Sequence, residues 1–115
     1  MATQFIASHN LEPLLERLRR HAEVHGPVQG ENGAVRFAAL TQDTLPDLSA
    51  LRTLLPPKKY LLHPRETILT YTAATGYQLP DETVRPLILF GLHPCDLAGI
   101  NYLDRVFLGD DPDPL

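Results

Sequence analysis

Apolar and polar positions along the chain follow two different periods, and these periods predict a mixed α/β domain. Between Asn10 and His25 leucines recur every three or four residues, which predicts an amphipathic helix with Asn10 as its N-cap. Glu16 and Arg20 lie four residues apart in the order that favours an ion pair on one helix face. The Gly26-Pro27 pair is expected to end this helix.

Two short segments predict strands. The stretch Ala34–Leu40 alternates apolar and polar side chains around Val35–Ala39, and it follows a turn-forming stretch, Gln29–Gly33. The run Leu87–Phe90 is short, branched and aromatic, and polar residues bound it. Such a run is typical of a buried strand.

The middle of the chain gives weaker signals. A short helix is expected over Asp47–Leu54, and a short buried strand over Tyr60–Leu62. Pro64 is expected to open a second short helix that reaches Leu69, and Thr75–Thr83 is expected to be a loop. The predicted fold class is therefore α/β: one small domain with a short sheet of three to five strands flanked by helices.

The clearest candidate for a site follows the strand at Leu87–Phe90. Gly91 breaks this strand, and a helix is predicted over Pro94–Phe107, because proline is tolerated at a first helical position. Cys95, the single cysteine, stands between His93 and Asp96 at this strand–turn–helix joint. Ligands of α/β sheets bind at the carboxyl ends of strands, where helix N-termini favour negative charge.

Two interpretations of Cys95 are open. A thiol at a helix N-terminus can have a pKa lowered from about 8.5 to roughly 3.5–7.5, as in a nucleophile or redox sensor. A free cysteine can also be a small buried apolar residue. Helical periodicity predicts one broad inward arc with Cys95 at its edge. The other residues of the arc are Gly99, Ile100, Tyr102, Leu103, Val106 and Phe107. We therefore expect a shielded, slowly reacting thiol.

Composition excludes several classes of function. The net charge of −4 gives no basic footprint for nucleic acid, and no apolar run approaches the roughly 20 residues that span a bilayer. The first residues lack the features of a secretory signal, so a cytoplasmic location is expected. One cysteine allows neither an internal disulfide nor a self-contained four-cysteine metal site. His21 and His25 have metal-binding spacing, but no third ligand is placed beside them, which favours solvated histidines.

Cations flank the apolar triplet Tyr60–Leu62. Lys58 and Lys59 precede it, and Arg65 follows it with Glu66 as its neighbour. One interpretation is a surface that faces an acidic partner or an anion, and the other is a solvated rim at the end of a strand.

Two segments together resemble a known family. They are LLPPKKYLLHPRETI and RPLILFGLHPCDLAGINYLDRVFLGDD. Their order and content resemble the N-terminal domain of the iron–sulfur β subunits of sulfhydrogenases, which carry two [4Fe–4S] clusters, and of the corresponding iron–sulfur subunits of anaerobic sulfite reductases. The resemblance extends over roughly residues 51–110.

The resemblance implies an electron-transfer role and a two-part architecture. Residues 1–109 would form the N-terminal α/β domain, and residues 110–115 would begin a linker to a ferredoxin-like domain. The cluster cysteines of that domain are absent from this sequence, so [4Fe–4S] clusters are expected in the full-length protein and no cofactor or metal in this chain. The family's motif positions fall on Cys95 and Asp96 in the second segment and on four charged residues in the first, namely Lys58, Lys59, Arg65 and Glu66.

Three functions follow as hypotheses. The first is a domain, non-catalytic by itself, of an iron–sulfur electron-transfer subunit of a hydrogenase or sulfite reductase-like oxidoreductase, which docks the cluster domain or a partner subunit. The alternative is a small cysteine-dependent enzyme or redox sensor, with Cys95 as nucleophile and His93 or His63 as base. The third is an interaction module whose cations meet an acidic partner.

Overall fold

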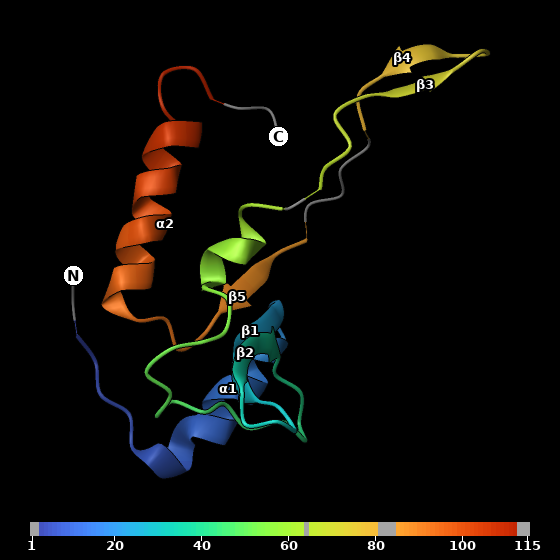
Figure 1. Cartoon of the computed structure of the whole chain (residues 1–115). Helices are drawn as coiled ribbons and strands as arrows, with labels where there is room; N and C mark the ends of the chain where they lie inside the picture. Colours follow the sequence, from blue (N-terminus) through green and yellow to red (C-terminus); the bar gives the residue numbers. More distant parts are fainter. Residues whose placement is uncertain (1–2, 64, 81–84, 113–115) are drawn as a thin grey trace.

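The computed structural model describes residues 3–63, 65–80 and 85–112 (Figure 1). This part of the chain contains two α-helices, two short 3-10 helices and five strands in two sheets. The predicted mixed α/β class is confirmed, and the five strands divide into a sheet of three and a hairpin of two.

The three-stranded sheet has the order β2-β1-β5. Strand β1 (Glu23–Gln29) lies at its centre, antiparallel to β2 (Val35–Ala39) and parallel to β5 (Leu87–Leu89). The strands predicted at Val35–Ala39 and Leu87–Phe90 are confirmed. Because β1 and β5 run parallel, their carboxyl ends meet at one edge of the sheet, and the segment after β5 leaves from that edge.

Helix α1 (Leu11–Arg19) is shorter than predicted. The ion pair of Glu16 with Arg20 is present at 3.4 Å, but the prediction of a helix to His25 is wrong, since β1 begins at Glu23. Val24 is buried against Leu15 and Leu40, so pairing with two strands decides the conformation here. Tertiary contacts of this kind override local helical periodicity.

The Gly26-Pro27 pair lies inside β1, so the prediction that it ends a helix is also wrong. The carbonyl oxygen of Pro27 accepts a hydrogen bond from the backbone N–H of Asp47 at 2.7 Å, which shows that this residue's backbone points away from β2. Proline has no backbone N–H, but an N–H at this position would not point toward β2. No hydrogen bond between β1 and β2 is therefore lost. At Gly26 a Cβ would lie 2.9 Å from Leu40 Cδ1, so glycine permits the close packing.

The core lies between α1 and the sheet. In the described residues the buried apolar side chains are few, and smaller contributions come from half-buried neighbours on α1, β1 and β5. Leu15, Val24 and Leu40 form this core, and Phe37 is buried on the other side of the sheet, where it meets the Tyr60 ring. On the other face of the sheet the 3-10 helix η2 (Pro57–Tyr60) is anchored by buried Pro57.

Three predictions for the middle of the chain are wrong. Asp47–Leu54 is not a helix, because its backbone bonds to the sheet instead: Leu54 N–H donates to the carbonyl of Val35 at 2.8 Å. Tyr60–Leu62 is not a strand, since η2 ends at Tyr60 and a turn follows. Residues 65–69 are not helical, and Pro64, which was expected to open that helix, lies outside the described residues.

A β-hairpin occupies part of the predicted loop Thr75–Thr83. Strand β3 (Thr70–Thr72) pairs with β4 (Gly76–Gln78), which corrects the loop prediction for its first part, while residues 81–83 lie outside the described residues. Figure 1 shows this hairpin standing away from the three-stranded sheet. The radius of gyration, 17.6 Å, exceeds the roughly 13 Å of a compact domain of this length.

Helix α2 (Pro94–Phe107) has the predicted bounds. It packs mainly against η2 and stands beside the sheet in Figure 1. The joint between β5 and α2 therefore lies next to η2, and these two elements build the candidate site.

Candidate functional site

The structure brings the two unusual sequence segments together. A crevice runs between η2 and the first turns of α2, and its lining contains Lys58 from the first segment and Cys95, Asp96 and Gly99 from the second. These residues are more than 35 positions apart in the sequence. Packing of α2 against η2 therefore makes one site from the two segments.

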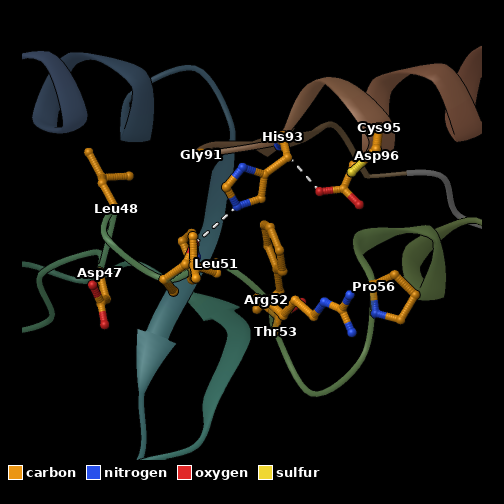
Figure 2. Close-up of a pocket in the computed structure, with 13 residues that line it drawn as sticks. Asp47, Leu48, Leu51, Arg52, Thr53, Pro56, Gly91, His93, Cys95 and Asp96 are labelled. Atoms are coloured by element: carbon orange, nitrogen blue, oxygen red, sulfur yellow. Dashed lines mark hydrogen bonds between the residues drawn. The ribbon is translucent and has the colours of Figure 1, made fainter.

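A second hollow of about 190 Å³ adjoins the crevice (Figure 2). Pro27 and Phe37 of the sheet form its base, the loop from Asp47 to Pro56 forms one wall, and the turn from Gly91 to Asp96 forms the other. Small-molecule sites usually enclose about 300–1,000 Å³. The hollow is thus below the size of a typical cofactor site and has a mainly apolar wall.

A glycine and a local hydrogen bond fix the conformation of the turn between β5 and α2. Gly91 adopts a φ of 80°, a conformation in which glycine has no steric penalty. The Asp96 carboxylate accepts a hydrogen bond from the backbone N–H of His93 at 3.2 Å. An acidic side chain in the first turn also complements the positive end of the helix dipole. Asp96 therefore positions the start of α2.

The His93 side chain holds the turn to the opposite wall. Its Nε2 lies 3.1 Å from the carbonyl oxygen of Ala50, so Nε2 carries the hydrogen and donates (Figure 2). Among the described residues no hydrogen bond joins His93 to Cys95, and His63 lines neither hollow. The thiol consequently has no base placed beside it in the manner of cysteine enzymes.

Cys95 is exposed, so the prediction that it faces inward is wrong. Tyr102 and Val106, from the same arc, are exposed as well, at 68% and 55%. Another part of the predicted arc, about a quarter turn away, is half-buried as expected and includes Ile100 and Leu103. The reason is that α2 packs mainly on η2 rather than across a sheet. Slow reaction of a shielded thiol is no longer expected.

The charged residues of the first segment separate into two groups. The Lys59 ammonium donates to the carbonyl oxygen of Phe37 at 2.8 Å and lies 5.2 Å from the centre of the Tyr60 ring, so it ties η2 to β2. Lys58 is exposed at the crevice. Arg65 and Glu66 are exposed but line neither hollow.

A series of side-chain hydrogen bonds, which the sequence did not reveal, joins η2 to β1. The Tyr60 hydroxyl lies 2.8 Å from His25 Nδ1, and His25 Nε2 lies 2.7 Å from the carboxylate of Glu23. The rings of His25 and Tyr60 meet edge to face at 5.1 Å. His25 is in a strand, so it does not form a helical pair with His21. Across the described residues, no three His, Cys, Asp or Glu side chains cluster as a metal site would require.

Titration of Tyr60 should report this chain of hydrogen bonds. Burial raises the pKa of Tyr60 above its ordinary value of 10.0, and the negative charge of Glu23 raises that pKa further. Because the folded pKa is the higher one, the associated stability is complete below pH 10 and is lost as the pH rises through the folded value. The difference in phenolate absorbance between the wild type and Tyr60→Phe isolates the titration of Tyr60. The midpoint of this titration should lie above pH 10. A midpoint at or below 10 would show that the hydroxyl is solvated.

Comparison with known proteins identifies a relative. Over 98 residues, or 85% of this chain, the sequence is 35% identical to Sulfhydrogenase 2 subunit beta of Pyrococcus furiosus. The chain spans 28% of the length of that protein. Neither a protein-family profile nor a solved structure matches the chain. The predicted resemblance to the β subunits of sulfhydrogenases is confirmed.

No helix in the described ranges 3–63, 65–80 and 85–112 has the length and apolar character that a membrane crossing requires.

Proposed function

We propose that this chain, a domain related to the β subunits of sulfhydrogenases, serves as a docking domain in an iron–sulfur electron-transfer subunit. The parent enzyme is a hydrogenase or a sulfite reductase-like oxidoreductase in the cytoplasm. The chain is non-catalytic by itself, and it binds the cluster domain, a partner subunit, or both. The [4Fe–4S] clusters belong to the cluster domain and not to residues 1–109.

The extent of exposed apolar surface carries this proposal. Twenty large apolar side chains are exposed in the described residues, whereas the buried apolar side chains number four. The loop from Asp47 to Pro56 contributes several of them, and of these Leu48 and Leu51 line the hollow. Exposed apolar side chains that gather on one wall are typical of protein–protein interfaces. We infer that another polypeptide covers the wall and the crevice.

The comparison supports the same interpretation. The relative is by name a subunit, and most of its length lies outside the matched region. Lys58, exposed in the crevice, is the cation that we assign to the partner, whereas Lys59 is occupied by the carbonyl of Phe37. Arg65 and Glu66 stay predicted partner contacts.

A cysteine-dependent activity retains one supporting observation, the exposed thiol of Cys95. Replacement of Cys95 by serine separates the two functions. A docking domain keeps its partner when the thiol is lost, whereas a cysteine enzyme or redox sensor loses its activity.

Co-purification tests the docking function. The chain is tagged in its source cells, purified with what binds it, and assayed for iron, acid-labile sulfide and visible absorbance. We expect a stable complex that contains iron and sulfide in cluster stoichiometry, while the chain expressed alone contains neither. A bound complex free of iron and sulfide would overturn the proposal.

Matched variants locate the docking surface in the same assay. Leu51 is 90% exposed on the wall, and Leu51→Asp should lower retention of the iron–sulfur partner tenfold or more, as loss of an apolar anchor does. Leu79, 73% exposed beyond β4, serves as the control, and Leu79→Asp should leave retention unchanged. Equal losses from both variants would place the partner elsewhere.

A further inference from the structure

The hollow has room for one ring-sized side chain. Its volume is about 190 Å³, and an apolar cavity of about 150 Å³ is large enough to hold a benzene molecule. Pro27 and Phe37 give it an apolar base, and Leu48 and Leu51 add apolar side chains from the loop wall, the loop from Asp47 to Pro56. A single aromatic side chain of a partner therefore fits the hollow.

Four charged side chains line the hollow and the crevice, and they differ in what they already bind. The Asp47 carboxylate accepts hydrogen bonds from the backbone N–H and the hydroxyl of Ser49, at 3.1 and 2.6 Å. The Asp96 carboxylate accepts one from the backbone N–H at the start of α2. Arg52 and Lys58 are exposed, and neither forms an ion pair within the part of the chain that the structure describes.

The two cations lie on the same side of the hollow. Pro56 lines both the hollow and the crevice, Arg52 lines the hollow, and Lys58 lines the crevice. Figure 2 shows the Arg52 guanidinium pointing toward Pro56, whereas Asp47 lies at the other end of the loop wall. Asp96 is the carboxylate on the side of Pro56, so two cations stand there against one anion.

A covering polypeptide would leave these cations in need of a counter-ion. The docking function proposed above places a polypeptide over the loop wall and the crevice, which removes water from Arg52 and Lys58. Burial of a cation without an anion is strongly unfavourable, and a well-placed carboxylate offsets it. Asp47 and Asp96 lie beyond ion-pair distance from both cations. The carboxylate therefore has to come from the partner.

We propose that the docking partner inserts one aromatic side chain into the hollow and places a neighbouring carboxylate against Arg52 and Lys58. The inference rests on the docking function proposed above and adds the chemistry of the partner's contact, an aromatic residue beside an acidic one. The ring packs against Phe37, and the carboxylate accepts charge-assisted hydrogen bonds from the guanidinium. A side chain seated in a desolvated pocket is the kind of contact that dominates the affinity of an interface.

Small probes test this chemistry on the chain alone. Phenylacetate combines a ring with a carboxylate, phenylacetamide has the same shape without the charge, and phenethylamine carries a cation. Phenylacetate should bind with a dissociation constant on the order of 5 mM, which is ordinary for a probe of its size. Phenylacetamide should bind at least about threefold more weakly, and phenethylamine more weakly still.

Shifts of the Leu48 and Leu51 methyl signals in NMR spectra report binding in the hollow. Equal affinities for phenylacetate and phenylacetamide, or no shift with either probe, would overturn the proposal.

Filling the hollow tests the aromatic anchor in the complex. Ala50 lines the hollow, so Ala50→Leu should take up its room and lower retention of the iron–sulfur partner about tenfold or more. Ala74→Leu adds the same atoms at the exposed turn of the hairpin and should leave retention unchanged. Full retention by an Ala50→Leu chain that no longer binds phenylacetate would show that the partner's anchor lies elsewhere.

Charge reversal tests the carboxylate and covers the case in which Ala50→Leu disturbs the loop. Arg52→Glu should slow association of the iron–sulfur partner at least about tenfold at roughly 0.05 M salt, and the difference should shrink at about 1 M salt. Arg36→Glu is the matched control, because Arg36 is exposed on β2 and alternation along the strand turns it away from the face of Phe37. Equal slowing by both variants would contradict a specific contact with Arg52.

The docking function and this inference fail in different ways. A wild-type chain that retains no polypeptide with iron and sulfide would overturn the docking function. A wild-type chain that retains it, together with equal retention by Ala50→Leu and Arg52→Glu, would leave the docking function standing and overturn the aromatic and acidic contact.

Discussion

Replacing Leu15 by alanine should lower the free energy of unfolding by about 2–5 kcal/mol. Leu15 is fully buried and packs with Val24 and Leu40, so its removal leaves a cavity at the centre of the core. Whole domains are stable by only about 5–15 kcal/mol, and a domain with so few buried side chains belongs at the lower end. The variant should be partly unfolded at room temperature, which urea denaturation followed by circular dichroism measures.

Leu51→Ala is the control for this prediction. Leu51 is the same residue type but is 90% exposed, so its truncation should change the free energy of unfolding by no more than about 0.5 kcal/mol. A cost for Leu51→Ala equal to that for Leu15→Ala would mean that the loop wall, and not the α1–sheet interface, stabilises the fold.

Elements with strong local signals were predictable from the sequence. The apolar runs of β2 and β5 and the proline-initiated α2 each carry their pattern within a few residues, and all three are confirmed. Strand β1 was missed because its first residues continue the helical spacing of α1 and because Gly26-Pro27 normally ends an element. Its strand conformation comes from pairing with β2 and β5, which are distant in sequence.

The middle of the chain was mispredicted for a related reason. Residues 47–54 form no helix because backbone N–H groups at both ends of this segment bond to carbonyl oxygens of β1 and β2, and the side chain of Lys59 does the same. Lys59 illustrates this, because its ammonium bonds to Phe37, 22 positions away. Propensity and periodicity describe neighbours along the chain, so they give no information about such bonds.

For the candidate site, the predicted inward orientation of Cys95 was wrong. Periodicity identified the apolar arc of α2 that contains Cys95, Tyr102 and Val106, but it does not reveal which neighbour covers that arc. The part of the predicted inward arc with Ile100 and Leu103 is half-buried as expected, because η2 is the neighbour within this chain, whereas Cys95, Tyr102 and Val106 are exposed. The link from Tyr60 to His25 spans 35 positions and has no sequence signal.

Gly91 affects both the stability of the fold and the geometry of the candidate site. Its φ of 80° is unfavourable by roughly 1–2 kcal/mol for any residue with a side chain. A Cβ there would also lie 3.0 Å from Pro27 Cδ and 3.2 Å from Leu48 Cδ2, which adds about 1–3 kcal/mol of overpacking. Gly91→Ala should therefore lower the free energy of unfolding by about 2–5 kcal/mol. It should also weaken partner docking, because the turn carries His93 and its bond to Ala50.

Two other glycines separate the causes of this loss. Gly76 has a φ of 73° but open space around its Cβ position, so Gly76→Ala should lose only the roughly 1–2 kcal/mol of conformational penalty. Gly99 is helical and equally uncrowded, so Gly99→Ala should raise the free energy of unfolding by about 0.5–1 kcal/mol. The predicted order of stability is thus Gly99→Ala, wild type, Gly76→Ala, Gly91→Ala, measured by urea denaturation. A Gly91→Ala variant as stable as Gly76→Ala would show that the turn is not packed against Pro27 and Leu48.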